Sequence, residues 1–249
     1  MKKNYFYLLF MALVTMLSLS FVSCGDDEND DKDDGVDTTP IRLAAGSEKI
    51  ITGADTISSS NKFVAYGKGN TVYAWHVGET ALLVNEKKTI SLTVYPQYYL
   101  YDDPVCEWGC SSDYVKKNQT QGTLNSRSTN ELLVYENAGG ATLLSYSFKE
   151  GKLTTILAMV STNHTSTLGS YLAERFLMLP LYEGDKTYYA GIDGIEMESA
   201  NTYVLMDMYS TKYWEVGYVK ADINSTRSAS DIDDMKELKE KLIPFMTND

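Results

Sequence analysis

Two kinds of hydrophobic pattern divide the chain. The first is one uninterrupted apolar run, Tyr5–Val22, which carries no charge and follows Lys2 and Lys3. From residue 40 onward, apolar residues instead occur in short β-branched or aromatic runs separated by glycine-containing or charged turns. The long run is typical of a targeting segment, and the short runs are typical of β-strands. The pattern therefore predicts a mostly β protein behind a signal peptide.

Strand signals fill residues 40–97. The clearest are Thr71–Trp75, Ala81–Val84 and Ile90–Tyr95, and they recur about every ten residues. Short strands at this spacing are what a small β-sandwich requires. We therefore predict a small β-sandwich over this range.

Residues 98–249 show a helix signal followed by strand signals, and this order occurs twice. A cap at Ser111 or Ser112 would start a short helix that ends at Lys117, and a cap at Ser166 or Thr167 would start a second helix. The strands predicted after the two helices are Glu131–Tyr135, Thr142–Phe148 and Leu153–Val160, and then Lys186–Ala190, Thr202–Met208 and Tyr213–Val219. We predict an α+β domain of helix-then-antiparallel-meander units, a candidate internal duplication of about 55 residues per unit.

A further helix is predicted near the C-terminal end of the α+β domain. It would start at a Ser230 cap and reach about Leu242, with Ile232, Met235, Leu238 and Leu242 on one stripe. This amphipathic stripe indicates that the helix packs on the domain.

The first apolar run ends at Ser23-Cys24. A small residue followed by a cysteine at the end of a signal peptide is where a bacterial lipoprotein is cleaved and acylated. The alternative is a marginal transmembrane helix, because about 18 apolar residues are the lower limit for spanning a bilayer. We predict a signal peptide over residues 1–23, lipidation of Cys24, and anchoring by acyl chains that do not span the membrane.

A dense acidic run follows the predicted anchor. Its charged residues are Asp26, Asp27, Glu28, Asp30, Asp31, Lys32, Asp33 and Asp34. On physical grounds, residues 24–39 form a solvated, self-repelling tether. The composition also resembles the surface-export signal of Bacteroidetes lipoproteins. That resemblance implies a lipid-anchored protein displayed on the surface of the outer membrane.

The formal net charge of the chain is −12. Nucleic-acid binding requires a basic patch that neutralises phosphates. The acidic balance therefore excludes a nucleic-acid partner, and it indicates solubility.

Residues 40–97 also resemble the bacterial Ig-like group 2 family. The segments that carry the resemblance are Ser60–Ala65, Val72–Ala74, Val77–Val84 and Leu92–Pro96, in that order. The resemblance implies an Ig-like β-sandwich that acts as a spacer or stalk. Some adhesins use such domains for binding, and the fold alone does not decide between the two roles.

The C-terminal region resembles the β-lactamase-inhibitor-protein-like architecture, which small outer-membrane assembly lipoproteins share. The residues that carry this pattern are Trp108, Gly109, Tyr146, Phe148, Gly151 and Leu153. The resemblance implies a sheet that contacts another protein.

Two cysteines remain beyond Cys24, in the sequence Cys106-Glu-Trp-Gly-Cys110. Outside the cytoplasm, such a nearby pair is most simply a disulfide that closes a tight loop. The alternatives are two free thiols or half of a zinc site. Redox motifs use two intervening residues rather than three, and further soft ligands for zinc are not concentrated nearby.

The chain holds 19 tyrosines and three tryptophans, a surplus over what a core of this size needs. Exposed aromatic rings stack on sugars and anchor protein interfaces. The alternative is that they fill the core, and one member of each adjacent strand pair is expected there. The candidate ligand-binding aromatics are Tyr98, Tyr99, Tyr101, Trp108, Tyr188, Tyr189, Tyr213 and Trp214.

Catalytic signals are few. His76 and His164 are not at ligand spacing and are expected to be surface or capping residues, so no metal or cofactor is predicted. Asp207 and Glu215 both lie in predicted strands and are a candidate carboxylate pair for glycoside hydrolysis. The function that best fits these observations is a non-catalytic surface lipoprotein. Its Ig-like stalk would present an α+β module that binds a glycan or a protein. The alternatives are an inhibitor or envelope-assembly factor that binds a protein through the α+β sheet, and a glycan-active enzyme.

Overall fold

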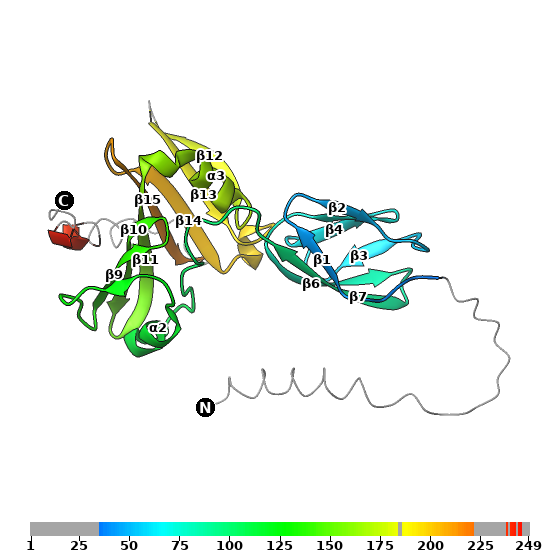
Figure 1. The fold of residues 1–249 in the computed structure, drawn as a ribbon, viewed down its shortest axis with the longest axis horizontal. Coiled ribbons are helices and arrows are strands. Elements are labelled where there is room, and N and C mark those ends of the chain that lie inside the picture. Colours follow the sequence, from blue (N-terminus) through cyan, green and yellow to red (C-terminus); the bar gives the residue numbers. More distant parts are fainter. Residues whose placement is uncertain (1–34, 184–185, 222–237, 239, 243, 246–249) are drawn as a thin grey trace. The chain divides into compact units, whose positions relative to one another are not determined.

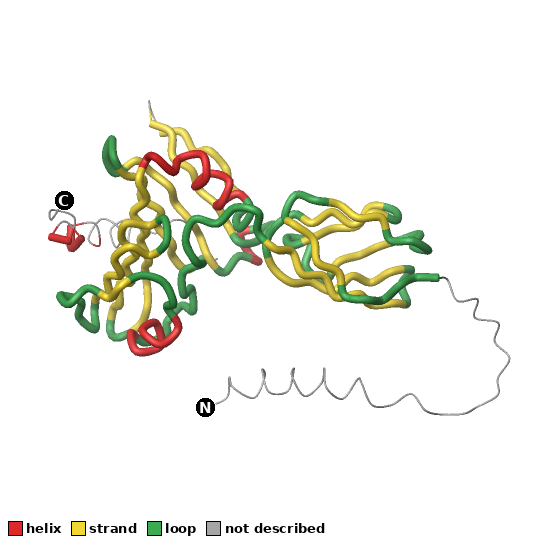
Figure 2. The backbone as a smooth tube through the Cα atoms, viewed as in Figure 1, coloured by secondary structure: helices red, strands yellow, loops and turns green. Residues whose placement is uncertain are grey.

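The computed structural model describes residues 35–183, 186–221, 238, 240–242 and 244–245. The predicted signal peptide, Cys24 and the acidic run up to Asp34 lie outside these residues. From Gly35 onward the chain forms one compact unit, built from three β-sheets and a few short helices (Figures 1 and 2). The prediction of a mostly β protein is therefore confirmed.

Seven short strands form a sandwich of two sheets. They are β1 (Ile41–Ala44), β2 (Glu48–Ile50), β3 (Ile57–Ser59), β4 (Ala65–Lys68), β5 (Thr71–Ala74), β6 (Gly78–Val84) and β7 (Lys88–Tyr95). One sheet has the order β1-β7-β6-β3, and the other has the order β2-β5-β4. Strand β1 runs parallel to β7, and the other pairs are antiparallel. Figure 1 shows these strands in blue to blue-green.

The sandwich core follows from strict alternation along the strands. On β6, Leu82 is 0 % exposed, whereas the next residue, Leu83, is 40 % exposed. On β5, Val72 and Ala74 are likewise buried, and Tyr73 lies on the outer side. Because strand neighbours point to opposite faces, the apolar residues at every second position meet between the two sheets.

The described residues after the sandwich form an eight-stranded sheet, with helices α2 and α3 between its strands. The strands are β8 (Thr123–Leu124), β9 (Leu132–Ala138), β10 (Ala141–Lys149), β11 (Lys152–Ser161), β12 (Leu177–Glu183), β13 (Lys186–Ile192), β14 (Thr202–Met208) and β15 (Tyr213–Lys220). The helices are α2 (Ser112–Asn118) and α3 (Thr165–Ala173), with short 3-10 helices η1 (Thr162–His164) and η2 (Met197–Ser199). All strand pairs in this sheet are antiparallel.

The strand order reflects two similar halves. Helix α2 is followed by β8 to β11, and helix α3 is followed by β12 to β15. In the sheet the order is β12-β13-β14-β15-β11-β10-β9-β8, so the last strands of the two halves are neighbours at the centre and the first strands lie at the edges. This arrangement agrees with the predicted pair of helix-then-meander units.

Both faces of this sheet are apolar. Helices α2 and α3 contribute Val115, Leu168 and Leu172 to a core on one face. On the opposite face, Leu238 and Leu242 of the predicted C-terminal helix join a second core. The predicted start of that helix lies outside the described residues.

In the α+β region, two strands and one cap differ from the sequence prediction. Strands β8 and β12 are new there, and each lies at an edge of the sheet. The second helix begins at Thr165, directly after the 3-10 turn η1, and the Ser161 hydroxyl accepts the Asn163 N–H at the start of that turn. The predicted cap at Ser166 or Thr167 is wrong because the chain turns into helix immediately at the end of β11. The predicted cap of α2 is confirmed, since Ser111 Oγ accepts the Tyr114 N–H at 3.3 Å.

The C-terminal end of α3 holds the segment that follows β7. Glu174 is buried, and its carboxylate accepts the backbone N–H groups of Gln97 at 3.1 Å and Tyr98 at 3.0 Å. The neighbouring Arg175 donates to Asp103 and to the carbonyl of Tyr98. These charge-assisted hydrogen bonds fix the chain between the sandwich and α2.

His76, expected at the surface, is buried at 1 % exposure. Its ring stacks on Phe63 with centroids 4.0 Å apart, and its Nδ1 lies 2.8 Å from the Phe63 carbonyl oxygen. The chain leaves β5 at Ala74 and turns into β6, and this turn packs His76 on Phe63. The surface prediction is wrong because a neutral imidazole with a hydrogen-bond partner can be buried at modest cost.

Burial of His76 predicts a pH dependence of stability. Desolvation lowers the pKa of His76 below its ordinary value of 6.5. Below about pH 6.5 the unfolded chain therefore binds more protons than the folded chain, and the free energy of unfolding falls as the pH falls. Urea midpoints measured from pH 8 to pH 5 should show this decrease. The decrease should be smaller in His76→Phe and unchanged in His164→Phe. Equal slopes in wild type and His76→Phe would contradict the assignment.

Candidate functional site

The predicted aromatic residues do not form one surface. Tyr101 is buried in the core under the helices, and its hydroxyl lies 2.6 Å from that of Tyr218. Burial raises the pKa of Tyr101. Its assignment as a ligand-binding residue is therefore wrong. Aromatic character alone does not distinguish a core tyrosine, whose hydroxyl has found a partner, from an exposed one.

The two predicted tryptophans are half-buried. The Trp108 indole N–H donates to Thr202 Oγ1 at 3.3 Å, and that of Trp214 donates to Thr165 Oγ1 at 2.8 Å. Both rings pack against the core under the helices. Tyr213 packs on the opposite face of the sheet, as the alternation of adjacent strand residues predicts. These three side chains thus serve packing on two different faces.

Tyr98 and Tyr99 are exposed, in the segment after β7. Tyr98 is held through its backbone by Glu174 and Arg175. These two tyrosines lie in the segment between β7 and α2 that also holds Tyr101 and Trp108, apart from the strands that carry the remaining candidates.

A different group of exposed side chains lies on strands β12, β13 and β14. Tyr182 is 76 % exposed, Tyr189 is 38 % exposed and Met208 is 51 % exposed. We call these three residues the ledge. Exposed large apolar side chains indicate an interaction site when they lie next to one another, because isolated ones are common on any protein surface.

The strand register places the ledge residues on one face. Pro180 pairs with Tyr189, and Tyr189 pairs with Met206. Tyr182 and Met208 each lie two residues along their strands from these partners, so both are diagonal neighbours of Tyr189 on the same face. Met206 is buried in the core under the helices. The ledge is thus the open continuation of the face that α3 covers.

The sequence indicated only part of the ledge. Tyr189 was among the candidates, and its neighbour Tyr188 is less exposed and faces the other way. Tyr182 was missed because Pro180 interrupts the strand signal of β12. Met208 is not aromatic, so the surplus of aromatic residues does not indicate it. A proline-containing run directly before a strong strand signal is typical of an edge strand, and this pattern could have indicated β12 and Tyr182.

The structure has Cys106 and Cys110 as free thiols, so the predicted disulfide is not formed in it. The backbone of Cys110 is tied to β11, since its carbonyl accepts the Leu153 N–H at 2.9 Å, whereas Cys106 packs against the core under the helices. Desolvation raises the pKa of Cys106 to about 12 and also raises that of Cys110. Because the thiolate is the reactive form, this rise in pKa disfavours nucleophilic chemistry at both residues.

The candidate carboxylates Asp207 and Glu215 are direct cross-strand partners on β14 and β15. Glu215 is only 2 % exposed, and Asp207 Oδ1 accepts the N–H of Met208 at 2.7 Å. A glycosidase needs both carboxyl groups open to the sugar. The burial of Glu215 does not fit that requirement.

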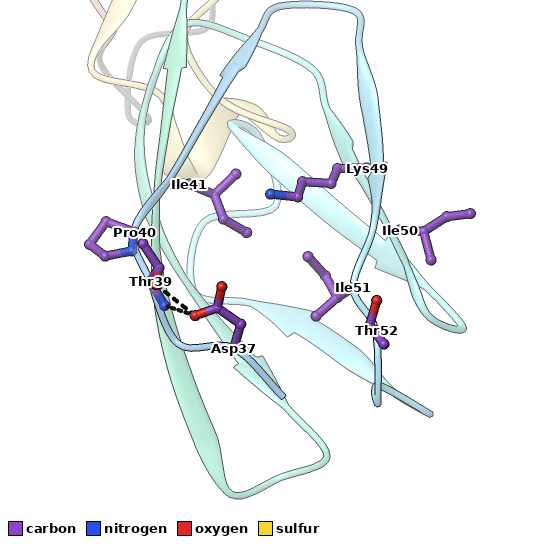
Figure 3. Close-up of a pocket in the computed structure, with 8 residues that line it drawn as sticks. All are labelled: Asp37, Thr39, Pro40, Ile41, Lys49, Ile50, Ile51 and Thr52. Carbon is purple, nitrogen blue, oxygen red and sulfur yellow. Dashed lines mark hydrogen bonds between the residues drawn. The ribbon is translucent and has the colours of Figure 1, made fainter. Parts of the chain in front are cut away.

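One small pocket opens between β1 and β2 at the edge of the sandwich (Figure 3). Its volume is about 200 Å³, below the range of about 300–1,000 Å³ that is usual for ligand sites. Asp37 Oδ1 accepts the N–H and the hydroxyl of Thr39 at 2.9 and 2.6 Å, and these bonds lower the pKa of Asp37. Figure 3 shows Lys49 on the pocket side of β2 and Ile50 pointing away. An inward-pointing lysine is typical of a protected sheet edge.

Within the described part of the chain, no group of three or more His, Cys, Asp and Glu side chains is placed to hold a metal ion. Within the same residues, no helix combines the length and apolar character needed to cross a membrane. Comparison of the chain with protein-family models, curated proteins and solved structures finds no match.

Proposed function

We propose that the protein is a non-catalytic lipoprotein, held at the surface of the outer membrane through Cys24, whose α+β domain binds another protein through the ledge. The tether of residues 24–39 and the sandwich would space this domain from the membrane. The anchor and location rest on the sequence signals of the first 34 residues.

The observation that carries the proposal is the ledge itself. Tyr182, Tyr189 and Met208 adjoin one another on regular strands of a large sheet. Tyrosine and methionine are enriched at protein interfaces, and tyrosine is frequent among residues that dominate binding energy. Because the strands are fixed by their neighbours, the side chains are presented with little ordering cost on binding.

A second candidate function is that of an inhibitor or envelope-assembly factor. The observation that favours it is the duplicated strand order of the eight-stranded sheet, which agrees with the resemblance noted above. The same ledge would make the contact, and only the identity of the partner would differ.

Substitution of single ledge residues is expected to weaken binding to cells. The purified soluble Cys24→Ala form would be added to intact cells of the natural host from which the gene for this protein has been deleted. Bound protein would be measured by flow cytometry. Tyr182→Ala and Tyr189→Ala should each weaken binding at least about tenfold, because removing an interface tyrosine commonly costs about 2 kcal/mol.

The matched control is Tyr99→Ala, since Tyr99 is also highly exposed but lies outside the ledge. This variant should bind like the parent form. Protease treatment of the cells should remove binding, and periodate treatment should not. Binding that survives protease but is lost after periodate would identify a glycan and contradict a protein ligand. Equal binding by all variants would contradict the ledge as the site.

A further inference from the structure

Three aromatic side chains lie together on the outer face of the sandwich. Tyr66 on β4 and Tyr73 on β5 are direct cross-strand partners, and Trp75 follows β5 two residues after Tyr73. Ala65, which precedes Tyr66, and Ala74, which lies between Tyr73 and Trp75, face the core. Tyr66, Tyr73 and Trp75, which we call the platform, therefore point away from the core and do not contribute to its packing.

The rings of the platform hold one another in place. Tyr66 and Tyr73 stack with centroids 5.1 Å apart and planes 13° apart. Trp75 meets Tyr66 edge to face, with centroids 6.3 Å apart and planes at 83°. The Trp75 ring also contacts the buried ring of His76, with centroids 4.5 Å apart, and the backbone N–H of Trp75 donates to the Val64 carbonyl at 2.8 Å. The arrangement is ordered before any ligand arrives, which lowers the cost of binding.

Two of these rings remain open to solvent. Tyr66 is 42 % exposed and Trp75 is 40 % exposed. Their planes are nearly perpendicular. A small ligand with a flat apolar face can therefore stack on one of the two rings while its edge contacts the other. Aromatic faces of this kind accept the C–H face of a sugar ring.

The charges beside the platform are balanced. Glu48 lies directly opposite Tyr73 on β2, and Lys68 follows Tyr66 by two residues on the same side of β4. Both are exposed. Together they supply one acceptor and one donor with no net charge, which complements a neutral ligand rich in hydroxyl groups.

We propose that the platform is a carbohydrate-binding site that takes a pyranose ring of a neutral polysaccharide. One face of the sugar stacks on Trp75 or Tyr66, and its hydroxyl groups reach Glu48, Lys68 and the tyrosine hydroxyls. The sandwich then binds a ligand of its own instead of serving only as a spacer. This inference goes beyond the proposed function, because the ledge and the platform are on different sheets.

Affinity electrophoresis with the soluble Cys24→Ala chain tests the platform. Native gels would contain one neutral polysaccharide each, from a panel of α-glucan, β-glucan, mannan and xylan, and retardation would be compared with a gel without polysaccharide. At least one polysaccharide should retard the chain. Trp75→Ala and Tyr66→Ala should each lower the affinity at least about tenfold, and Trp75→Phe should retain part of it.

The control variant is Tyr95→Ala, because Tyr95 is 41 % exposed on the other sheet of the sandwich. It should be retarded like the parent chain, and thermal unfolding should show that all variants are folded. The proposal is overturned if no neutral polysaccharide retards the folded parent chain, or if Trp75→Ala and Tyr66→Ala are retarded equally with it. Because the gels contain no protein ligand, either result is independent of the outcome at the ledge.

Discussion

Replacement of Cys24 by alanine is expected to move the protein from the membrane fraction to the soluble fraction. The sequence places this cysteine after an uncharged apolar run and a small residue, where lipoprotein signals are cleaved and acylated. One acyl chain gives only marginal membrane binding, whereas the diacylglycerol and amide-linked chains expected at Cys24 give stable anchoring. Loss of the thiol removes the attachment point for all of them, so the expected effect is nearly complete release.

Fractionation of cells followed by immunoblotting measures this effect. Cys106→Ala and Cys110→Ala are the matched controls, because both residues lie in the folded part of the chain. These two variants should stay with the membrane. If Cys24→Ala also stayed with the membrane, the anchor would have to be the apolar segment itself.

Replacement of Leu82 by alanine is expected to destabilise the sandwich by about 2–5 kcal/mol. Leu82 is fully buried between the two sheets, so truncation removes apolar contacts and leaves a cavity that the neighbouring strands can only partly fill. Urea unfolding of the soluble form, followed by fluorescence, would show the shift in the midpoint.

Leu83 provides a control of identical chemistry at the next position. It lies on the outer side of β6, so Leu83→Ala should change the free energy of unfolding by less than about 0.5 kcal/mol. Similar losses in the two variants would contradict the register of β6 and β7, because a shift by one residue exchanges the buried and exposed positions.

Most of the strands could be predicted from the sequence. The runs Thr142–Phe148 and Thr202–Met208 are long, rich in β-branched or aromatic residues, and bounded by turn residues. They correspond closely to β10 and β14. At the turn between β10 and β11, Glu150 and Gly151 both have positive φ, as a tight hairpin requires.

Other features depended on tertiary structure. Strand β12 contains Pro180, which is tolerated because the strand lies at the edge of the sheet and pairs only with β13. The burial of Tyr101 depends on a partner, Tyr218, that is far away in the sequence. His76 is buried because Phe63 lies beneath it. Local pattern carries none of this information.

The candidate sites also combine features that the local sequence predicts with features that depend on tertiary structure. Sequence reasoning recognised that tyrosine and tryptophan are in surplus, but it could not assign each ring to a face. The register of β4 with β5 brings Tyr66 and Tyr73 together, and that of β12 to β14 brings Tyr182, Tyr189 and Met208 together. Neither group is contiguous in the sequence, so both emerge only from strand pairing.

Site-specific photo-cross-linking on intact cells tests the central claim most directly. A photoreactive phenylalanine would replace Tyr182, Tyr189 or Tyr99, one at a time, in the full-length chain that retains Cys24. We expect Tyr182 and Tyr189 positions to give a covalent adduct with the same protein, and the Tyr99 position to give none. Absence of an adduct from both ledge positions, or an equal yield of the same adduct from the Tyr99 position, would contradict the assignment of the ledge as the binding surface.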